Sequence, residues 1–138
     1  MRFMIMVRAN AESESETSPV ADEALMAAMA DYHEQLVQAG VLLDANGLQP
    51  SAKGWRIRYH HGKGTVVDGP FAESKELIAG YTVIQVASRE EALEWSRRFP
   101  SPFGASDCEI EVRQLYELED FGESKEVERF REMGVGRS

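Results

Sequence analysis

Cysteine is almost absent from this chain of 138 residues, where Cys108 stands alone. A single cysteine forms no internal disulfide, which fits the reducing cytoplasm, and we expect that localisation. No apolar run reaches the roughly 18 residues that indicate a membrane-spanning helix, so no membrane association is expected. The apolar stretch at 2–8 is too short for a secretory signal, includes the charge of Arg8, and is followed by no small-residue cleavage site.

Basic residues are outnumbered, with 15 Lys and Arg against 24 Asp and Glu and a net charge of −9. A nonspecific nucleic-acid binder needs a basic face that displaces counterions from phosphate, so we expect no direct nucleic-acid binding. The sequence also lacks a glycine-rich phosphate loop and a Ser–His–acid order with a nucleophile elbow.

Metal-ligand patterns are missing as well. His60 and His61 are adjacent, and successive residues of a strand point to opposite faces, so the two rings would not share a metal ion. No cysteine or carboxylate recurs at metal-ligand spacing. We therefore expect no metal and no cofactor.

What is present is the composition of a soluble domain large enough to bury a core, with 43% apolar and 28% charged residues. We expect a domain over 1–122 followed by a short helix and tail over 123–138. Asn46-Gly47 predicts a turn, and Ser88 with Glu91 predicts a capping box. Apolar spacing predicts strands at 2–8, 41–43, 55–59, 65–67, 78–86 and 109–116, and helices at about 19–39, 89–99 and 124–133, the last docking through Val127 and Phe130.

The order of these elements is strand, helix, strand and hairpin, strand, helix, strand. A compact solution is an α+β, ferredoxin-like sandwich with an inserted hairpin and two helices on one face of an antiparallel sheet. The other face would expose a wide apolar patch, which soluble monomers seldom tolerate. We therefore expect a homodimer, packed sheet against sheet.

The most informative stretch is 68–81, where an Asp-Gly-Pro-Phe turn and a charged link precede the apolar strand that contains Gly80-Tyr81. With the stretches 40–42, 47–50, 88–100 and 109–113, this motif resembles the YCII-related superfamily and, within it, the DGPF-domain proteins. The similarity covers roughly 1–122. It implies a ferredoxin-like fold assembled as a dimeric α/β barrel.

The same resemblance has functional implications. Relatives in the wider superfamily look like small-molecule enzymes with a presumed catalytic His–Asp pair. Asp68 carries over through the motif, whereas the helix position of the His falls on Met29, with His33 one turn later. DGPF proteins are often encoded beside extracytoplasmic-function sigma factors, which implies a regulatory connection.

Asp68 and His33 are the catalytic candidates. Asp68 would act as a general base or grip a ligand, or its side chain would cap its own turn, as Asp before Gly commonly does. His33 would exchange protons near neutral pH, or is a half-buried residue of an amphipathic helix.

Arg56, Arg58, Phe71 and Tyr81 are the ligand-binding candidates. The two arginines share one face of a strand and suit bidentate contact with a carboxylate or phosphate. The alternative is that they pair with Glu109, Glu111 or helix carboxylates. Tyr81 would offer its hydroxyl to a ligand or belong to the core.

Two functions follow as hypotheses. In the first, a small cytoplasmic dimer binds a small organic ligand in a cleft, with cofactor-independent acid–base chemistry of the isomerase or lyase kind as a further expectation. In the second, the chain is a non-catalytic regulatory or protein-interaction module linked to sigma-factor signalling. Its surface would be the acidic loop at 12–16, the segment 73–76 or the C-terminal tail.

Overall fold

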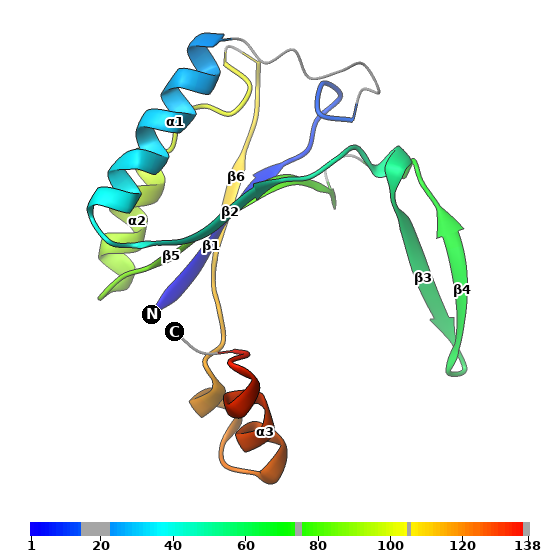
Figure 1. Cartoon of the computed structure of the whole chain (residues 1–138). Helices are drawn as coiled ribbons and strands as arrows, with labels where there is room; N and C mark the ends of the chain where they lie inside the picture. Colours follow the sequence, from blue (N-terminus) through cyan, green and yellow to red (C-terminus); the bar gives the residue numbers. More distant parts are fainter. Residues whose placement is uncertain (15–22, 74–75, 105, 137–138) are drawn as a thin grey trace.

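The body of the protein is a four-stranded antiparallel sheet with two helices against one face (Figure 1). The computed structural model describes residues 1–14, 23–73, 76–104 and 106–136. The sheet order is β2–β5–β1–β6. Its elements are β1 (Arg2–Arg8), α1 (Glu23–Gln38), β2 (Leu42–Gly47), β5 (Ile78–Gln85), α2 (Arg89–Arg97) and β6 (Ile110–Gln114). None of the described helices is both long and apolar enough to cross a membrane.

The core lies between the sheet and α1 and α2. Ile5 of β1, Ile84 of β5 and Leu36 of α1 are completely shielded from solvent, and Phe3 and Tyr32 complete the centre of the cluster. Alternate residues of β1 face this core, as the period of two in the sequence predicts. Burial of this apolar surface is the main force that holds the helices on the sheet.

The arrangement confirms the α+β prediction, and the strand order is compatible with the ferredoxin-like class. The predicted inserted hairpin is also present. It consists of β3 (Trp55–His60) and β4 (Lys63–Asp68), which form a separate two-stranded sheet that projects away from the body (Figure 1). The described residues of one chain form no closed barrel.

Two turns differ from the prediction. Asn46 and Gly47 are not a turn but the end of β2, because they pair with Tyr81 and Gly80 of β5. The hairpin turn is shorter than predicted, since β4 begins at Lys63 and only two residues form the loop. His61 leaves the strand with φ 49°, so the argument from opposite strand faces does not apply to His60 and His61, and the two rings lie 4.1 Å apart.

The helix ends follow their capping signals closely. The Ser88 hydroxyl accepts from the Glu91 amide at 3.1 Å, as predicted. The Glu91 carboxylate accepts from the Ala87 amide at 3.0 Å, one residue before the Ser88 amide that the predicted capping box requires. The predicted start of α1 at residues 18–19 lies outside the described residues. In α3 (Lys125–Met133), Val127 is buried as predicted, whereas Phe130 is only partly shielded, with 44% of its surface exposed.

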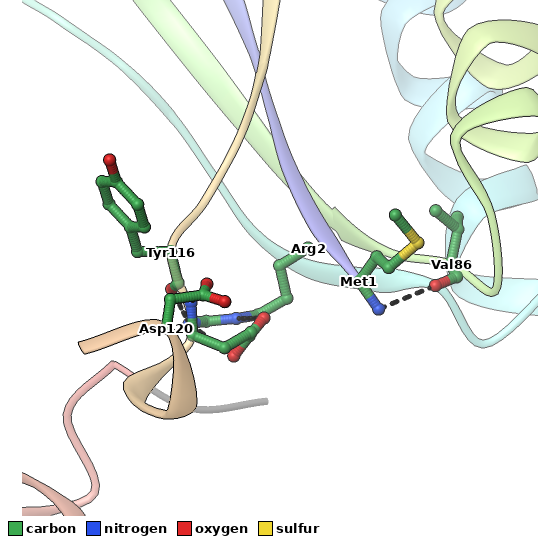
Figure 2. A network of polar contacts seen from close by, with 6 residues as sticks. Met1, Arg2, Val86, Tyr116 and Asp120 are labelled. Atoms are coloured by element: carbon green, nitrogen blue, oxygen red, sulfur yellow. Dashed lines mark hydrogen bonds and ion pairs between the residues drawn. The ribbon is translucent and has the colours of Figure 1, made fainter. Parts of the chain in front are cut away.

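A polar network attaches the C-terminal elements to the sheet (Figure 2). The Arg2 guanidinium contacts both carboxylate oxygens of Glu117, at 2.9 and 3.1 Å, and donates to the Tyr116 carbonyl at 3.1 Å. The Glu117 amide in turn donates to Asp120 of the short 3₁₀ helix η3 (Leu118–Phe121) at 2.8 Å. Since the Arg2 side chain is only 11% exposed, this bidentate pair is better shielded from water than an ordinary surface ion pair.

Tyr32 links the two helices. Its hydroxyl donates to the Trp95 carbonyl of α2 at 2.7 Å. Burial raises the pKa of Tyr32 from 10.0 to about 12, and the nearby Arg98 charge partly opposes that rise. The folded protein therefore keeps the Tyr32 proton at pH values where the unfolded chain has lost it.

We predict a specific pH dependence from this group. Between pH 10 and about 12 the unfolded chain loses the Tyr32 proton first, so this stabilising contribution is present below pH 10 and disappears as the pH rises toward 12. The difference in the free energy of unfolding between wild type and Tyr32→Phe should therefore become smaller across that pH range. Urea unfolding of both proteins at about pH 9 and about pH 11 measures it. The prediction would be contradicted if the free energy of unfolding fell by the same amount in both proteins between these two pH values.

Candidate functional site

The Asp-Gly-Pro-Phe turn connects β4 to β5 and packs directly on the segment that precedes the hairpin. The Gly69 amide donates to the Gly54 carbonyl at 3.0 Å. A Cβ atom added at Gly69 would lie 1.9 Å from the Ser51 carbonyl oxygen. The turn therefore requires glycine at this position because two backbone segments approach too closely for any side chain.

Ser51 connects three separate parts of the chain. Its amide donates to the Glu14 carboxylate at 2.8 Å, and its hydroxyl donates to the other oxygen of the same carboxylate. The hydroxyl also accepts from the Phe71 amide at 3.0 Å. The loop after β1, the 3₁₀ helix η1 (Ser51–Lys53) and the motif turn are thereby held in one arrangement.

A groove of about 220 Å³ lies beside this network. Its apolar lining comes from the ends of β2 and β5, and its charged groups are Glu14 and Lys53. Because both Glu14 oxygens already accept from Ser51, Lys53 is the charged group of the lining without a side-chain partner within the described residues. The volume is below the roughly 300–1,000 Å³ typical of pockets for drug-sized ligands, so it suits a small molecule. The complete lining is Glu14, Leu48, Gln49, Pro50, Ser51, Lys53, Gly54, Leu77 and Ile78.

Asp68 is exposed at the end of β4, where it pairs with Trp55. Across the described residues its carboxylate forms no hydrogen bond or ion pair, so it does not cap its own turn there. It is not part of the groove lining either. The carboxylate is open to solvent on the same hairpin face as Trp55.

The structure brings Arg56 and Phe71 together. The Arg56 guanidinium stacks over the Phe71 ring at 3.8 Å from its centroid, a cation–π contact. Arg58 lies further along the same face of β3 and is exposed. The alternative partner Glu111 binds Arg8 instead, at 2.8 Å.

His33 lies in a different place, between α1 and the sheet. Its Nδ1 contacts the Met29 carbonyl at 2.7 Å, and its Nε2 contacts the Thr82 hydroxyl at 2.8 Å. Since a carbonyl only accepts, Nδ1 carries a proton and donates to the Met29 carbonyl, while Nε2 and the Thr82 hydroxyl share the second hydrogen bond. The ring also meets Phe99 edge-on at 6.2 Å between centroids. Both nitrogens are therefore engaged in contacts that hold the helix on the sheet.

Tyr81 belongs to a polar cluster on the sheet face that α1 and α2 leave uncovered. Its hydroxyl donates to Asp44 at 3.1 Å, while the Asn46 amide group donates to the Tyr81 hydroxyl at 3.0 Å and to Asp44 at 3.2 Å. Sequence reasoning missed Asp44 and Asn46. The signal was their spacing of two residues, which places both on one face of a strand once Asn46 is assigned to β2.

Comparison with known proteins shows which family this chain belongs to. A model of the YCII-related domain matches residues 1–119, which span β1 through the first half of η3. The chain belongs to the YCII-related family. It is also similar to an uncharacterized protein of Rhizobium meliloti (strain 1021), with 36% identity over 94 residues that cover 68% of this chain and 75% of that relative.

In this YCII-related chain the predicted site residues occupy three regions. Arg56, Phe71 and Asp68 lie at or near the base of the hairpin, with Arg58 further along it, whereas Tyr81 is on the uncovered sheet face. His33 belongs to α1 and lies between that helix and the sheet. The helix α1 and the hairpin lie on opposite sides of the body (Figure 1). One chain therefore does not bring His33 and Asp68 together.

No group of three or more metal-ligating side chains gathers among the described residues. Within the same residues, every buried side-chain nitrogen and oxygen atom has a hydrogen-bond partner. The surfaces expected for a regulatory partner, at 12–16 and 73–76, fall partly outside the described residues.

We predict that Gly69→Ala destabilises the protein by about 1–3 kcal/mol, because the added methyl group must push the turn away from the Ser51 carbonyl. Gly54→Ala is the matched control. Its Cβ would lie 3.7 Å from the same oxygen, and its backbone is extended, so it should be nearly neutral. Urea unfolding of the three proteins measures the difference. Equal midpoints for wild type and Gly69→Ala would contradict the importance of the close approach.

Proposed function

We propose that this YCII-related protein binds a small organic acid in the groove beside the Asp-Gly-Pro-Phe turn. The observation that supports it is the pairing of an apolar lining, from Leu48, Leu77 and Ile78, with Lys53, which has no side-chain partner in the described part of the chain. An apolar pocket wall with a small number of polar or charged groups is the usual composition of a small-molecule site. Lys53 would bind the carboxylate, and the apolar residues would contact the body of the ligand.

The Ser51 network prepares this site before a ligand arrives. Because Glu14 accepts two hydrogen bonds from Ser51, its negative charge is already stabilised and does not compete for Lys53. The same hydroxyl fixes the motif turn through the Phe71 amide. A site held by such contacts loses little conformational freedom on binding.

The geometry favours binding over catalysis. General acid–base chemistry needs a proton donor and acceptor within hydrogen-bond reach of the same substrate. Asp68 has no such partner among the described residues of its own chain, and both nitrogens of His33 are engaged under α1. The alternative of a regulatory partner has no specific supporting contact in the described residues.

A titration of isotope-labelled protein with benzoate tests the proposal. We expect shifts of the backbone amides of Leu48, Gly54 and Ile78, and at least about tenfold weaker binding for Lys53→Gln, because a charge-assisted hydrogen bond is lost. Lys63→Gln, which removes the same charge at the hairpin tip, is the control and should bind like wild type. Neutral benzamide should bind as weakly to wild type as benzoate binds to Lys53→Gln. Equal benzoate affinity of wild type and Lys53→Gln would refute the role of Lys53.

We also propose that the functional form is a homodimer in which two uncovered sheet faces pack together. The centre of this face is apolar, with Met4, Met6 and Val83, and its two edges carry Asp44 on β2 and Arg113 on β6. Asp44, Val83, Met4 and Arg113 lie in one row across the sheet. A two-fold axis parallel to the strands would therefore set Asp44 of one copy opposite Arg113 of the other.

Charge reversal tests this packing. Arg113→Asp should weaken dimerisation, because it places two carboxylates opposite each other twice per dimer. The double variant Asp44→Arg/Arg113→Asp should restore it, since both contacts are re-formed with the charges exchanged. Sedimentation equilibrium of the three proteins measures the dissociation constants. A double variant no better than the single one would exclude this pairing.

A further inference from the structure

The β3–β4 hairpin stands apart from the sheet that carries the rest of the core (Figure 1). Two contacts among the described residues fix its base, where the Gly69 amide donates to the Gly54 carbonyl and the Arg56 guanidinium stacks on the Phe71 ring. An isolated two-stranded hairpin is marginally stable in water at best and needs a surface to pack against. The six paired residues of each strand therefore require an explanation beyond their own hydrogen bonds.

One face of this hairpin is an exposed apolar surface, which we call the arm patch. It consists of Trp55, Ile57, Tyr59 and Val66, which share a face because Ile57 pairs directly with Val66 in the ladder and Trp55 and Tyr59 alternate with it along β3. Their exposed fractions are 64%, 48%, 75% and 62%.

The arm patch is continuous across both strands. A Cβ atom at Gly64 would lie 2.9 Å from the Ile57 side chain and 3.3 Å from the Tyr59 ring, so both side chains lie over the glycine. The absence of a side chain at Gly64 therefore lets Tyr59 rest against the opposite strand. The result is an apolar surface over both strands with two aromatic residues, the type that is enriched in protein interfaces.

The charge of the hairpin is opposite to that of the remaining chain. Residues 55–68 contain Arg56, Arg58 and Lys63 against Asp68, a net charge of +2. The whole chain carries −9, so the rest carries −9 − 2 = −11. A basic hairpin on an acidic body is attracted to the body of a second copy, and such complementarity steers association and suppresses other partners.

The area of the arm patch is sufficient for a dimer in which the hairpin of each copy packs on the other copy. Two aromatic and two branched aliphatic side chains exposed to this degree present on the order of 400 Å². In a two-fold dimer each arm and each receiving surface contribute once, which gives about 1,600 Å² in total, the usual area of a stable protein interface.

We propose that the β3–β4 hairpin is an arm that grips a second copy of this chain through the arm patch. This packing would also change the surroundings of Asp68 in the Asp-Gly-Pro-Phe turn. Because Asp68 pairs with Trp55 on the same face, docking of the arm brings the Asp68 carboxylate to the junction between the two copies. Asp68 thus reaches groups of the second copy, although none of its own chain lies within reach in the described residues.

Two neighbouring substitutions test the arm. Tyr59→Thr removes an aromatic ring from the arm patch, while His60→Thr removes one from the opposite face of the same strand, and Thr suits a strand in both places. We expect Tyr59→Thr to raise the dimer dissociation constant at least about 30-fold, since aromatic anchors dominate interfaces and two arms change at once. His60→Thr should sediment like wild type. Equal effects of the two variants, or a wild type that remains a monomer, would overturn the proposal.

Photocrosslinking supplies a readout that does not depend on the stability of a variant. With p-benzoylphenylalanine in place of Tyr59, illumination should give covalent dimers of two 15.5 kDa chains, and in place of His60 it should give few. Peptide mapping should find the Tyr59 crosslink on a second copy, established with chains of two isotopic compositions. A dimer in which Tyr59 crosslinks only within its own chain would show that the sheets associate without the arm. Copurified nucleic acid or another protein as the sole crosslinked species would also refute it.

Discussion

The hydrogen bonds of Ser51 are the constraint on which the motif region depends. One hydroxyl and one amide satisfy both oxygens of Glu14, and the same hydroxyl accepts from the amide of Phe71. The Ser51 carbonyl, in turn, leaves no room for a side chain at Gly69. The orientation of the hairpin and the shape of the groove both follow from this small set of contacts, because η1 precedes the first strand of the hairpin and the motif follows its second.

Much of the fold was predictable because its signals are local. The period of two in β1, the Ser88 cap and the alternation of Trp55, Ile57 and Tyr59 each depend on neighbouring residues only, and each was confirmed. The errors arose where distant partners decide. Asn46-Gly47 has turn chemistry, but the β5 ladder holds it in a strand.

The candidate site was harder to predict for the same reason. The sequence identified residues with suitable chemistry but not their distribution over separate surfaces. Arg56 and Phe71 meet because the motif turn folds back on the base of β3, a contact that no spacing reveals. Conversely, His33 has the right side chain for proton transfer, yet Thr82 and the Met29 carbonyl occupy its ring. Lys53 belongs to no sequence motif, and its place in the groove is recognised only in the folded structure.

The central position of β1 in the sheet has a consequence for folding during synthesis of the protein. β1 is synthesised before both of its neighbours, since it pairs on one side with β5 and on the other with β6, whose last residue is Gln114. At synthesis rates of about 5–20 residues per second, β1 waits several seconds or more for its second neighbour. During that time its apolar side chains have no finished sheet to join. The nascent chain is thus most exposed to aggregation and to chaperones until β6 has been synthesised.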